Sequence, residues 1–156
     1  MVCRILVNQL EQDVQLVYLP NPALNGDELR RAIATELAVD SVDSTNLVEE
    51  IQAKLIELAR RGLPVVLFVD EAQALSDEAL EVLRLFGNLE TEYNKLIQIV
   101  LFGQPELDER LEQHHLRQFR QRITFSARLR MLTIAEVVAY IDNRLEKSGG
   151  EDGIFT

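Results

Sequence analysis

The sequence is poor in cysteine and in long apolar runs, and each shortage excludes a class of protein. Cys3 is the single cysteine, so an internal disulfide and a cysteine-based metal site are excluded and a reducing compartment is expected. The longest apolar run, residues 63–70, is far shorter than the roughly 18 to 20 residues of a membrane-spanning helix, and the N-terminus has no signal-peptide pattern. We therefore expect a soluble, cytoplasmic protein.

Positive charge is also scarce. The chain has 16 Lys and Arg against 26 Asp and Glu, which gives a formal net charge of −10. Such a charge opposes general attraction to nucleic acid or to anionic membranes, so a nucleic-acid role would need a local basic patch. With 156 residues, 47% of them hydrophobic, the chain is long enough for one domain with a core and too short for two full domains.

The spacing of apolar residues predicts helices and strands that alternate along the chain. Strands are expected over residues 13–19, 63–70, 96–103 and 122–125. Helices are expected over residues 1–10, 25–38, 44–62, 76–89 and 133–148, with a short helix that begins at Pro105. The second and third strand segments lack polar alternation, which is typical of strands buried on both faces of a parallel sheet. The sequence thus predicts an α/β fold, a parallel sheet flanked by helices, with a helical tail.

Side chains that can cap a helix mark several of these starts. Asn25 or Asp27 precedes one helix, Ser76 precedes another, and Thr133 with Glu136 forms a capping box before the last.

Two adjacent carboxylates, Asp70 and Glu71, follow the apolar run directly. The carboxyl ends of parallel strands face the ligand crevice of a sheet, so both acids are expected where chemistry takes place. One carboxylate there can hold Mg²⁺, and its neighbour can orient or deprotonate an attacking water. The alternative is that acids are simply common where a buried strand ends, and a short motif alone does not decide between the two.

A polar amide, Gln104, occupies the equivalent position after the next apolar run. It could reach a γ-phosphate or the attacking water, and by itself it could equally be an ordinary loop residue before the helix that begins at Pro105.

Five arginines and no acid lie between Arg117 and Arg130. Arg117, Arg120 and Arg122 come just before the expected strand 122–125, and an arginine there can project toward a phosphate bound by a neighbouring subunit. The alternatives are a solvated basic face or a nucleic-acid patch.

Four segments in order, VVLFVDEAQAL, LFGQPELDERL, LRQFRQRITF and LTIAEVVAYIDNRL, resemble the AAA+ ATPases of the general secretion pathway protein A and MSHA pilus biogenesis type. The resemblance implies a P-loop NTPase-like core over residues 1–130 and the start of a helical lid over residues 131–156. It implies ATP and Mg²⁺ as cofactors, a homo-oligomer joined through arginine fingers, and secretion or pilus assembly proteins as partners at the cytoplasmic face of the bacterial inner membrane. Any membrane attachment would come from parts of the parent protein outside this chain.

The resemblance also assigns roles to single residues. Asp70 would be the Walker B ligand of magnesium, Glu71 the catalytic carboxylate and Gln104 the sensor 1 residue. Arg122 would be the arginine finger, with Arg120 as the second choice.

The phosphate-binding loop of that family is missing from the sequence. No G-x-x-x-x-G-K-[ST] pattern occurs, and none of the seven glycines is followed by lysine. We therefore expect a fragment that lacks this loop and most of the lid, and that binds ATP weakly or not at all by itself. Two other interpretations stay open: a non-catalytic AAA+-like interaction module, and a transposition-type AAA+ partner that binds DNA through residues such as Arg128 and Arg130.

Overall fold

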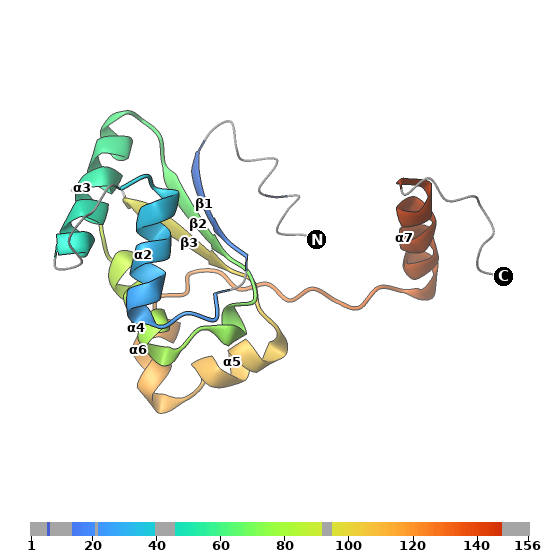
Figure 1. Ribbon diagram of the computed structural model, residues 1–156. Helices are drawn as coiled ribbons and strands as arrows, with labels where there is room; N and C mark the ends of the chain where they lie inside the picture. The colour runs from blue at the N-terminus through green and yellow to red at the C-terminus, as the bar shows by residue number, and fades with distance from the viewer. Residues whose placement is uncertain (1–5, 7–13, 21, 40–45, 92–94, 148–156) are drawn as a thin grey trace. The chain divides into compact units, whose positions relative to one another are not determined.

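The computed structural model describes residues 6, 14–20, 22–39, 46–91 and 95–147 (Figure 1). The chain divides into two compact units, Met1–Ile123 and Thr124–Thr156, and each is described by itself below. The expected helix over residues 1–10 lies outside the described residues except at Leu6, which is helical.

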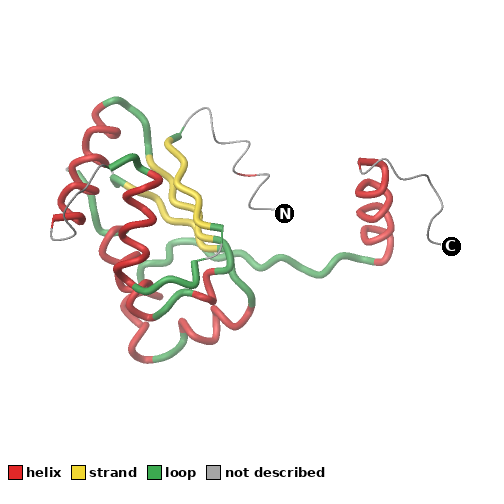
Figure 2. Tube along the Cα trace, viewed as in Figure 1, coloured by secondary structure: helices red, strands yellow, loops and turns green. Residues whose placement is uncertain are grey.

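The first unit is built around a three-stranded parallel sheet in the order β1-β2-β3, which confirms the predicted fold class. The strands are β1 (Gln15–Leu19), β2 (Val65–Val69) and β3 (Ile97–Leu101). Helices α2 (Gly26–Glu36) and α3 (Leu47–Arg60) lie between β1 and β2 in the chain, and α4 (Asp77–Phe86) lies between β2 and β3. Parallel neighbours need such crossover connections, and Figure 2 shows the strands side by side with helices along one face.

The central strand and its neighbour differ in burial. All five residues of β2 are buried, so burial on both faces is confirmed for this strand. The same expectation is wrong for β3, where Ile97 is buried, Gln98 is exposed and the other three residues are half-buried. The reason is position, because β3 is an edge strand of the described sheet and has a paired neighbour on one side alone.

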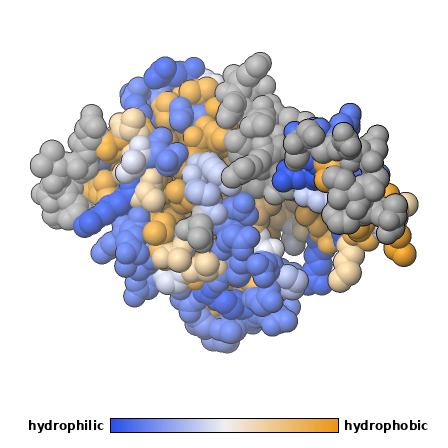
Figure 3. Space-filling view, turned by 45° about the vertical axis from the view of Figure 1, so that its right-hand side comes forward, coloured by the Kyte–Doolittle hydropathy of each residue, from blue (hydrophilic) through white to orange (hydrophobic). Residues whose placement is uncertain are grey.

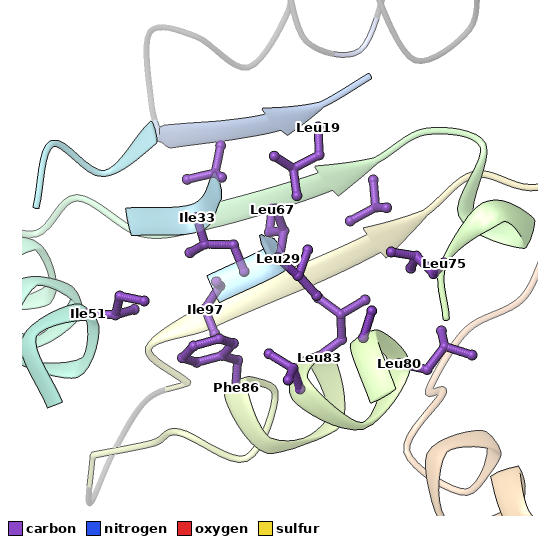
Figure 4. Close-up of a cluster of buried hydrophobic side chains, with 14 of the residues drawn as sticks. Leu19, Leu29, Ile33, Ile51, Leu67, Leu75, Leu80, Leu83, Phe86 and Ile97 are labelled. Atoms are coloured by element: carbon purple, nitrogen blue, oxygen red, sulfur yellow. The ribbon is translucent and has the colours of Figure 1, made fainter. Parts of the chain in front are cut away.

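One face of the sheet carries the main hydrophobic core (Figure 4). Alternate strand residues such as Val17 and Leu67 point into it and meet helix residues at spacings of three and four. The leucines and isoleucines of these helices with at most 1% exposure are Leu29, Ile33, Ile51, Leu55, Leu80 and Leu83. Each side chain of this kind stabilises the fold by about 1.5–3 kcal/mol relative to an exposed position.

The opposite face of the sheet holds a smaller cluster. Val66 and Phe68 are buried there, and Tyr18 and Phe102 are among the half-buried residues that pack against them. The rings of Phe68 and Phe102 stack with centroids 5.6 Å apart.

The predicted helix starts of α2 and α4 are confirmed. Asn25 accepts hydrogen bonds from the N–H groups of Asp27 and Glu28, both at 3.0 Å, and the Glu28 carboxylate accepts the Asn25 N–H at 2.9 Å. Ser76 Oγ accepts the Ala79 N–H at 3.1 Å. The start expected at Ser44 lies outside the described residues; α3 begins at Leu47.

The strand expected over residues 122–125 is wrong. After α5 (Pro105–Leu111) and α6 (Arg117–Arg120), the N–H of Arg122 bonds to the Phe119 carbonyl at 2.9 Å and continues a turn. Residues 123–133 then have no regular structure. A strand exists only when its backbone groups find a neighbouring strand, and neither edge of the described sheet pairs with this segment.

The second unit contains α7 (Ile134–Lys147), preceded by the predicted capping box. The Glu136 carboxylate accepts the Thr133 N–H at 2.8 Å, and the Glu136 N–H donates to Thr133 Oγ1 at 3.4 Å. No residue of α7 is buried. Its role as the start of a lid, and a domain boundary after residue 130, remain predictions.

The surface is largely hydrophilic on the face that Figure 3 shows, as expected for a chain of which 27% of the residues are charged. On the face shown in Figure 3, hydrophilic residues surround smaller hydrophobic areas. Among the described residues, no helix has the length and apolar character needed to cross a membrane.

Candidate functional site

Hydrogen bonds that extend past the strand ends bring the predicted site residues together. The N–H of Asp70 donates to the Leu19 carbonyl at 2.9 Å, and the N–H of Phe102 donates to the Val69 carbonyl at 2.8 Å. The N–H of Ala72 then donates to the Phe102 carbonyl at 2.8 Å. The segments that follow β2 and β3 are thereby fixed side by side at the carboxyl edge of the sheet, where parallel sheets bind ligands.

Asp70 is oriented from two sides. One carboxylate oxygen, Oδ1, accepts the N–H of Glu71 at 3.0 Å. The other, Oδ2, accepts the hydroxyl of Tyr18 on β1 at 3.4 Å. The residue is half-buried, so its carboxylate keeps access to solvent at the end of a fully buried strand.

Glu71 is exposed and has a left-handed backbone, with φ 53° and ψ 39°. For a residue with a Cβ this conformation costs about 1–2 kcal/mol, and it persists where surrounding contacts hold it. Here it turns the chain sharply from β2 into a short 3₁₀ turn, η2 (Ala72–Ala74).

Two side-chain amides converge on the Glu71 carboxylate. Gln73 Nε2 donates to Glu71 Oε2 at 2.6 Å, and Gln104 Nε2 donates to the same oxygen at 3.2 Å. The Gln73 carbonyl oxygen, Oε1, accepts the backbone N–H of Gln104 at 3.1 Å. The side chains of Glu71, Gln73 and Gln104, together with the Gln104 backbone N–H, form a closed set of hydrogen bonds between the ends of two neighbouring strands.

Arg110 on α5 holds the loop that carries Gln73. Its Nη1 donates to the carbonyls of Gln73 and Leu75 at 2.9 and 2.8 Å, and its Nη2 pairs with Asp77 at the start of α4. His115 Nε2 lies 2.8 Å from the other Asp77 oxygen. The hydrogen bond from Arg110, followed by that from His115, lowers the pKa of the Asp77 carboxyl. The Asp77 carboxylate, which links α4 to α5, is therefore ionised at neutral pH.

The two candidate arginine fingers lie apart from the carboxylates. Arg120 pairs with Glu112 at 3.5 Å. Lys95, and to a smaller extent Arg122, lowers the pKa of Glu90. Among the described residues, no hydrogen bond or ion pair joins either arginine to Asp70 or Glu71.

The donor set suits magnesium better than a metal that needs a full protein cage. In the described part of the chain, no three His, Cys, Asp or Glu residues gather at metal-ligand distance. Magnesium is usually held by one or two carboxylates with water and substrate phosphates. Asp70, fixed at a strand end and open to solvent, fits that pattern.

The structure brings together three of the five residues singled out from the sequence: Asp70, Glu71 and Gln104. It adds Gln73 and Arg110, which sequence reasoning missed. The signal for Gln73 was an amide two residues after Glu71. Nothing in the sequence marked Arg110, which lies between Glu109 and Leu111 in the last turn of a short helix.

The parallel sheet, its crossover helices and the polar residues at its carboxyl edge define an α/β protein of the P-loop NTPase-like class. Comparison with known families is specific within that class. The chain belongs to the AAA domain family, which it matches over residues 1–111.

A curated relative extends the match. The chain is 41% identical over 158 aligned positions to general secretion pathway protein A of Aeromonas hydrophila. The alignment covers 99% of this chain and 29% of that protein, so the chain spans less than a third of the relative's length. No solved structure matches the chain.

Proposed function

We propose that this chain is part of an ATP-binding and ATP-hydrolysing AAA+ module of a bacterial secretion or pilus assembly ATPase. The observation that carries the proposal is the position of Glu71, which lies next to Asp70 at the carboxyl edge of the sheet and 3.2 Å from the Gln104 amide. The similarity to general secretion pathway protein A supports the secretion role.

The chemistry follows from the strand-end geometry. Asp70 would hold Mg²⁺ together with phosphate oxygens, which neutralises charge on the triphosphate. Glu71 would orient the attacking water and accept its proton, and Gln104 would report on the γ-phosphate from the next strand. Bare carboxylates repel a triphosphate, so these residues require the metal to bind the nucleotide.

We assign the arginine finger to Arg122. Arg120 already pairs with Glu112, which leaves it less available to a second subunit. A finger acts on nucleotide held by a neighbour, so the proposal includes a homo-oligomer in which Arg122 faces the Asp70 edge of the next copy. A cytoplasmic location belongs to the same proposal.

The DNA-binding alternative gains no support from the arginines. Arg130 is engaged by both oxygens of Glu136 and Arg120 by Glu112, so part of the positive charge between residues 117 and 130 is neutralised within the chain.

These 156 residues contain no G-x-x-x-x-G-K-[ST] sequence, and this lowers the affinity for Mg-ATP that we expect of them. Each charge-assisted hydrogen bond from such a loop contributes roughly 1.5–3 kcal/mol, so losing two or three lowers nucleotide affinity by orders of magnitude. We therefore propose that this stretch binds Mg-ATP weakly or not at all when produced alone.

Calorimetry with Mg-ATP tests the proposal on this chain and on a version extended upstream through a phosphate loop. We expect binding by the extended version alone, retained in Glu71→Gln and weakened in Asp70→Asn. Equal binding by both versions would mean that the nucleotide uses another surface. Failure of the extended version to bind would overturn the ATPase proposal.

A further inference from the structure

Gln73 lies between the proposed catalytic carboxylate and the proposed sensor. Its side-chain amide uses both ends: Nε2 donates to Glu71 Oε2 at 2.6 Å, and Oε1 accepts the Gln104 N–H at 3.1 Å. The first contact is the shortest of the three hydrogen bonds in this set and involves a charged acceptor, which makes it the strongest of them.

We propose that Gln73 is a positioning residue that fixes the orientation of the Glu71 carboxylate and couples it to the end of β3. The inference rests on the proposed ATPase function, which it deepens by adding a residue to the same site.

The need for such a residue follows from the exposure of Glu71. An exposed glutamate can adopt many rotamers about its three side-chain torsions. The left-handed backbone at Glu71 fixes the direction of the Cα–Cβ bond but not the position of the carboxylate. Both amide donors act on Oε2. The described residues give Oε1 no hydrogen bond, so this oxygen is the one presented to an attacking water.

The backbone of Gln73 is held in place as well as its side-chain amide. Arg110 Nη1 donates a hydrogen bond to the Gln73 backbone carbonyl at 2.9 Å, and Gln73 is the central residue of the 3₁₀ turn η2. At the other end, the Gln73 amide lies beside Gly103: a Cβ there would be in ordinary contact with Gln73 Oε1, at 3.4 Å. Motion of α5 can therefore reach Glu71 through the Gln73 side chain, and motion of the segment after β3 through the side chains of Gln73 and Gln104.

Only an amide of this length makes both bonds. A glutamate at position 73 keeps the acceptor for the Gln104 N–H but loses the donor and places a like charge beside Glu71. Asparagine is one methylene too short to span both partners, and alanine removes both contacts.

The first arm of the test examines the geometry by NMR on this chain. We expect Glu71→Gln to shift the side-chain NH₂ resonances of both Gln73 and Gln104, and Gln73→Ala to shift the Gln104 backbone amide. Gln52→Ala, at an exposed position on α3, is the matched control and should leave these signals in place. Unchanged Gln104 signals in Gln73→Ala would overturn the coupling.

The second arm measures steady-state ATP turnover in the full-length gene product. We expect Gln73→Ala and Gln73→Glu to lower kcat by about 10- to 100-fold with KM changed less than about threefold, the pattern of a lost transition-state contact. The Gln52→Ala control should keep the parent kcat.

Three results would overturn the inference. If Gln73→Glu retains the parent kcat, the donor to Glu71 is irrelevant. If Gln73→Ala raises KM and lowers the melting temperature at constant kcat, the residue is merely structural. If the unmodified full-length protein shows no turnover, the proposed function fails and takes the inference with it, whereas loss confined to the Gln73 variants leaves that function standing.

Discussion

At the scale of single residues, Gly103 decides how closely α5 approaches the site. A Cβ at this position would lie 2.7 Å from Leu107 Cδ2 and 3.2 Å from Leu107 Cβ. The first distance is shorter than real carbon contacts, so a larger residue forces the Leu107 side chain to move, and the tight 3.2 Å distance to Leu107 Cβ requires a small shift at the start of α5 as well. Gly103 is thus required for close packing between the segment after β3 and the helix that follows.

We expect Gly103→Ala to lower the free energy of unfolding by about 1–3 kcal/mol, the usual cost of overpacking. Urea denaturation measures it. In a Leu107→Ala background the same change should cost less, because the closest atom is gone and the two effects are not additive. Equal costs in both backgrounds would mean that Leu107 is not the obstacle.

The three strand-end residues could be predicted because their positions depend on a simple rule. Asp70, Glu71 and Gln104 each follow an apolar run, and parallel strands place their carboxyl ends at one edge. Gln73 could not be predicted in the same way. Its amide meets Glu71 across a turn in which Glu71 adopts a left-handed backbone, a conformation that sequence patterns do not indicate for glutamate.

At the scale of elements, the capping box of α7 is strengthened by an ion pair between Arg130 and Glu136. Arg130 donates to both oxygens of Glu136, and Thr133 donates to the same carboxylate from its N–H and hydroxyl. The Arg130 hydrogen bond, followed by those from Thr133, lowers the pKa of Glu136 to about 2. The cap is therefore fully formed above the ordinary glutamate range and is lost as the pH falls through about 2.

We expect NMR titration of the Glu136 carboxyl to give a midpoint near 2, moving upward toward the ordinary value of 4.5 in Arg130→Ala. The reason is that the arginine stabilises the ionised form, so its removal makes protonation easier. A midpoint near 4.5 in the unmodified chain would contradict the bidentate contact.

Elements themselves were predictable to different degrees. The cap residues Asn25, Ser76 and Thr133 identified helix starts because capping is a local interaction. The expected strand over residues 122–125 failed because a strand depends on a partner elsewhere in the chain, which local apolar pattern does not specify.

At the scale of the whole molecule, ion pairs join segments that are distant in the sequence. Asp77 at the start of α4 pairs with Arg110 on α5 and with His115 in the turn that follows α5. The pKa of the Asp77 carboxyl is lowered from its ordinary value of 3.8 in the folded state. The ion pair therefore contributes its full stability at a pH above 3.8, and this stability is lost as the pH falls through the lowered pKa of the folded state. Asp77 is 50% exposed, which limits the contribution to about 1 kcal/mol or less.

We expect Asp77→Asn to be less stable than the parent at neutral pH and equal to it at a pH well below 3.8. Urea denaturation across this range measures the difference. Glu109→Gln is the control, because Glu109 is exposed on the same helix as Arg110 and makes no ion pair with the described residues. A difference that persists unchanged in acid would assign the effect to packing.

The order of the strands also sets the order in which the chain can fold. Gln15 pairs with Val65 and Val65 with Ile97, so every rung of the sheet joins segments separated by at least one helix. None of the three described strands is joined to its neighbour by a hairpin, and closing such long loops makes parallel sheets slow to form. During synthesis on the ribosome, β1 cannot form its ladder with β2 until α2, α3 and β2 have all emerged.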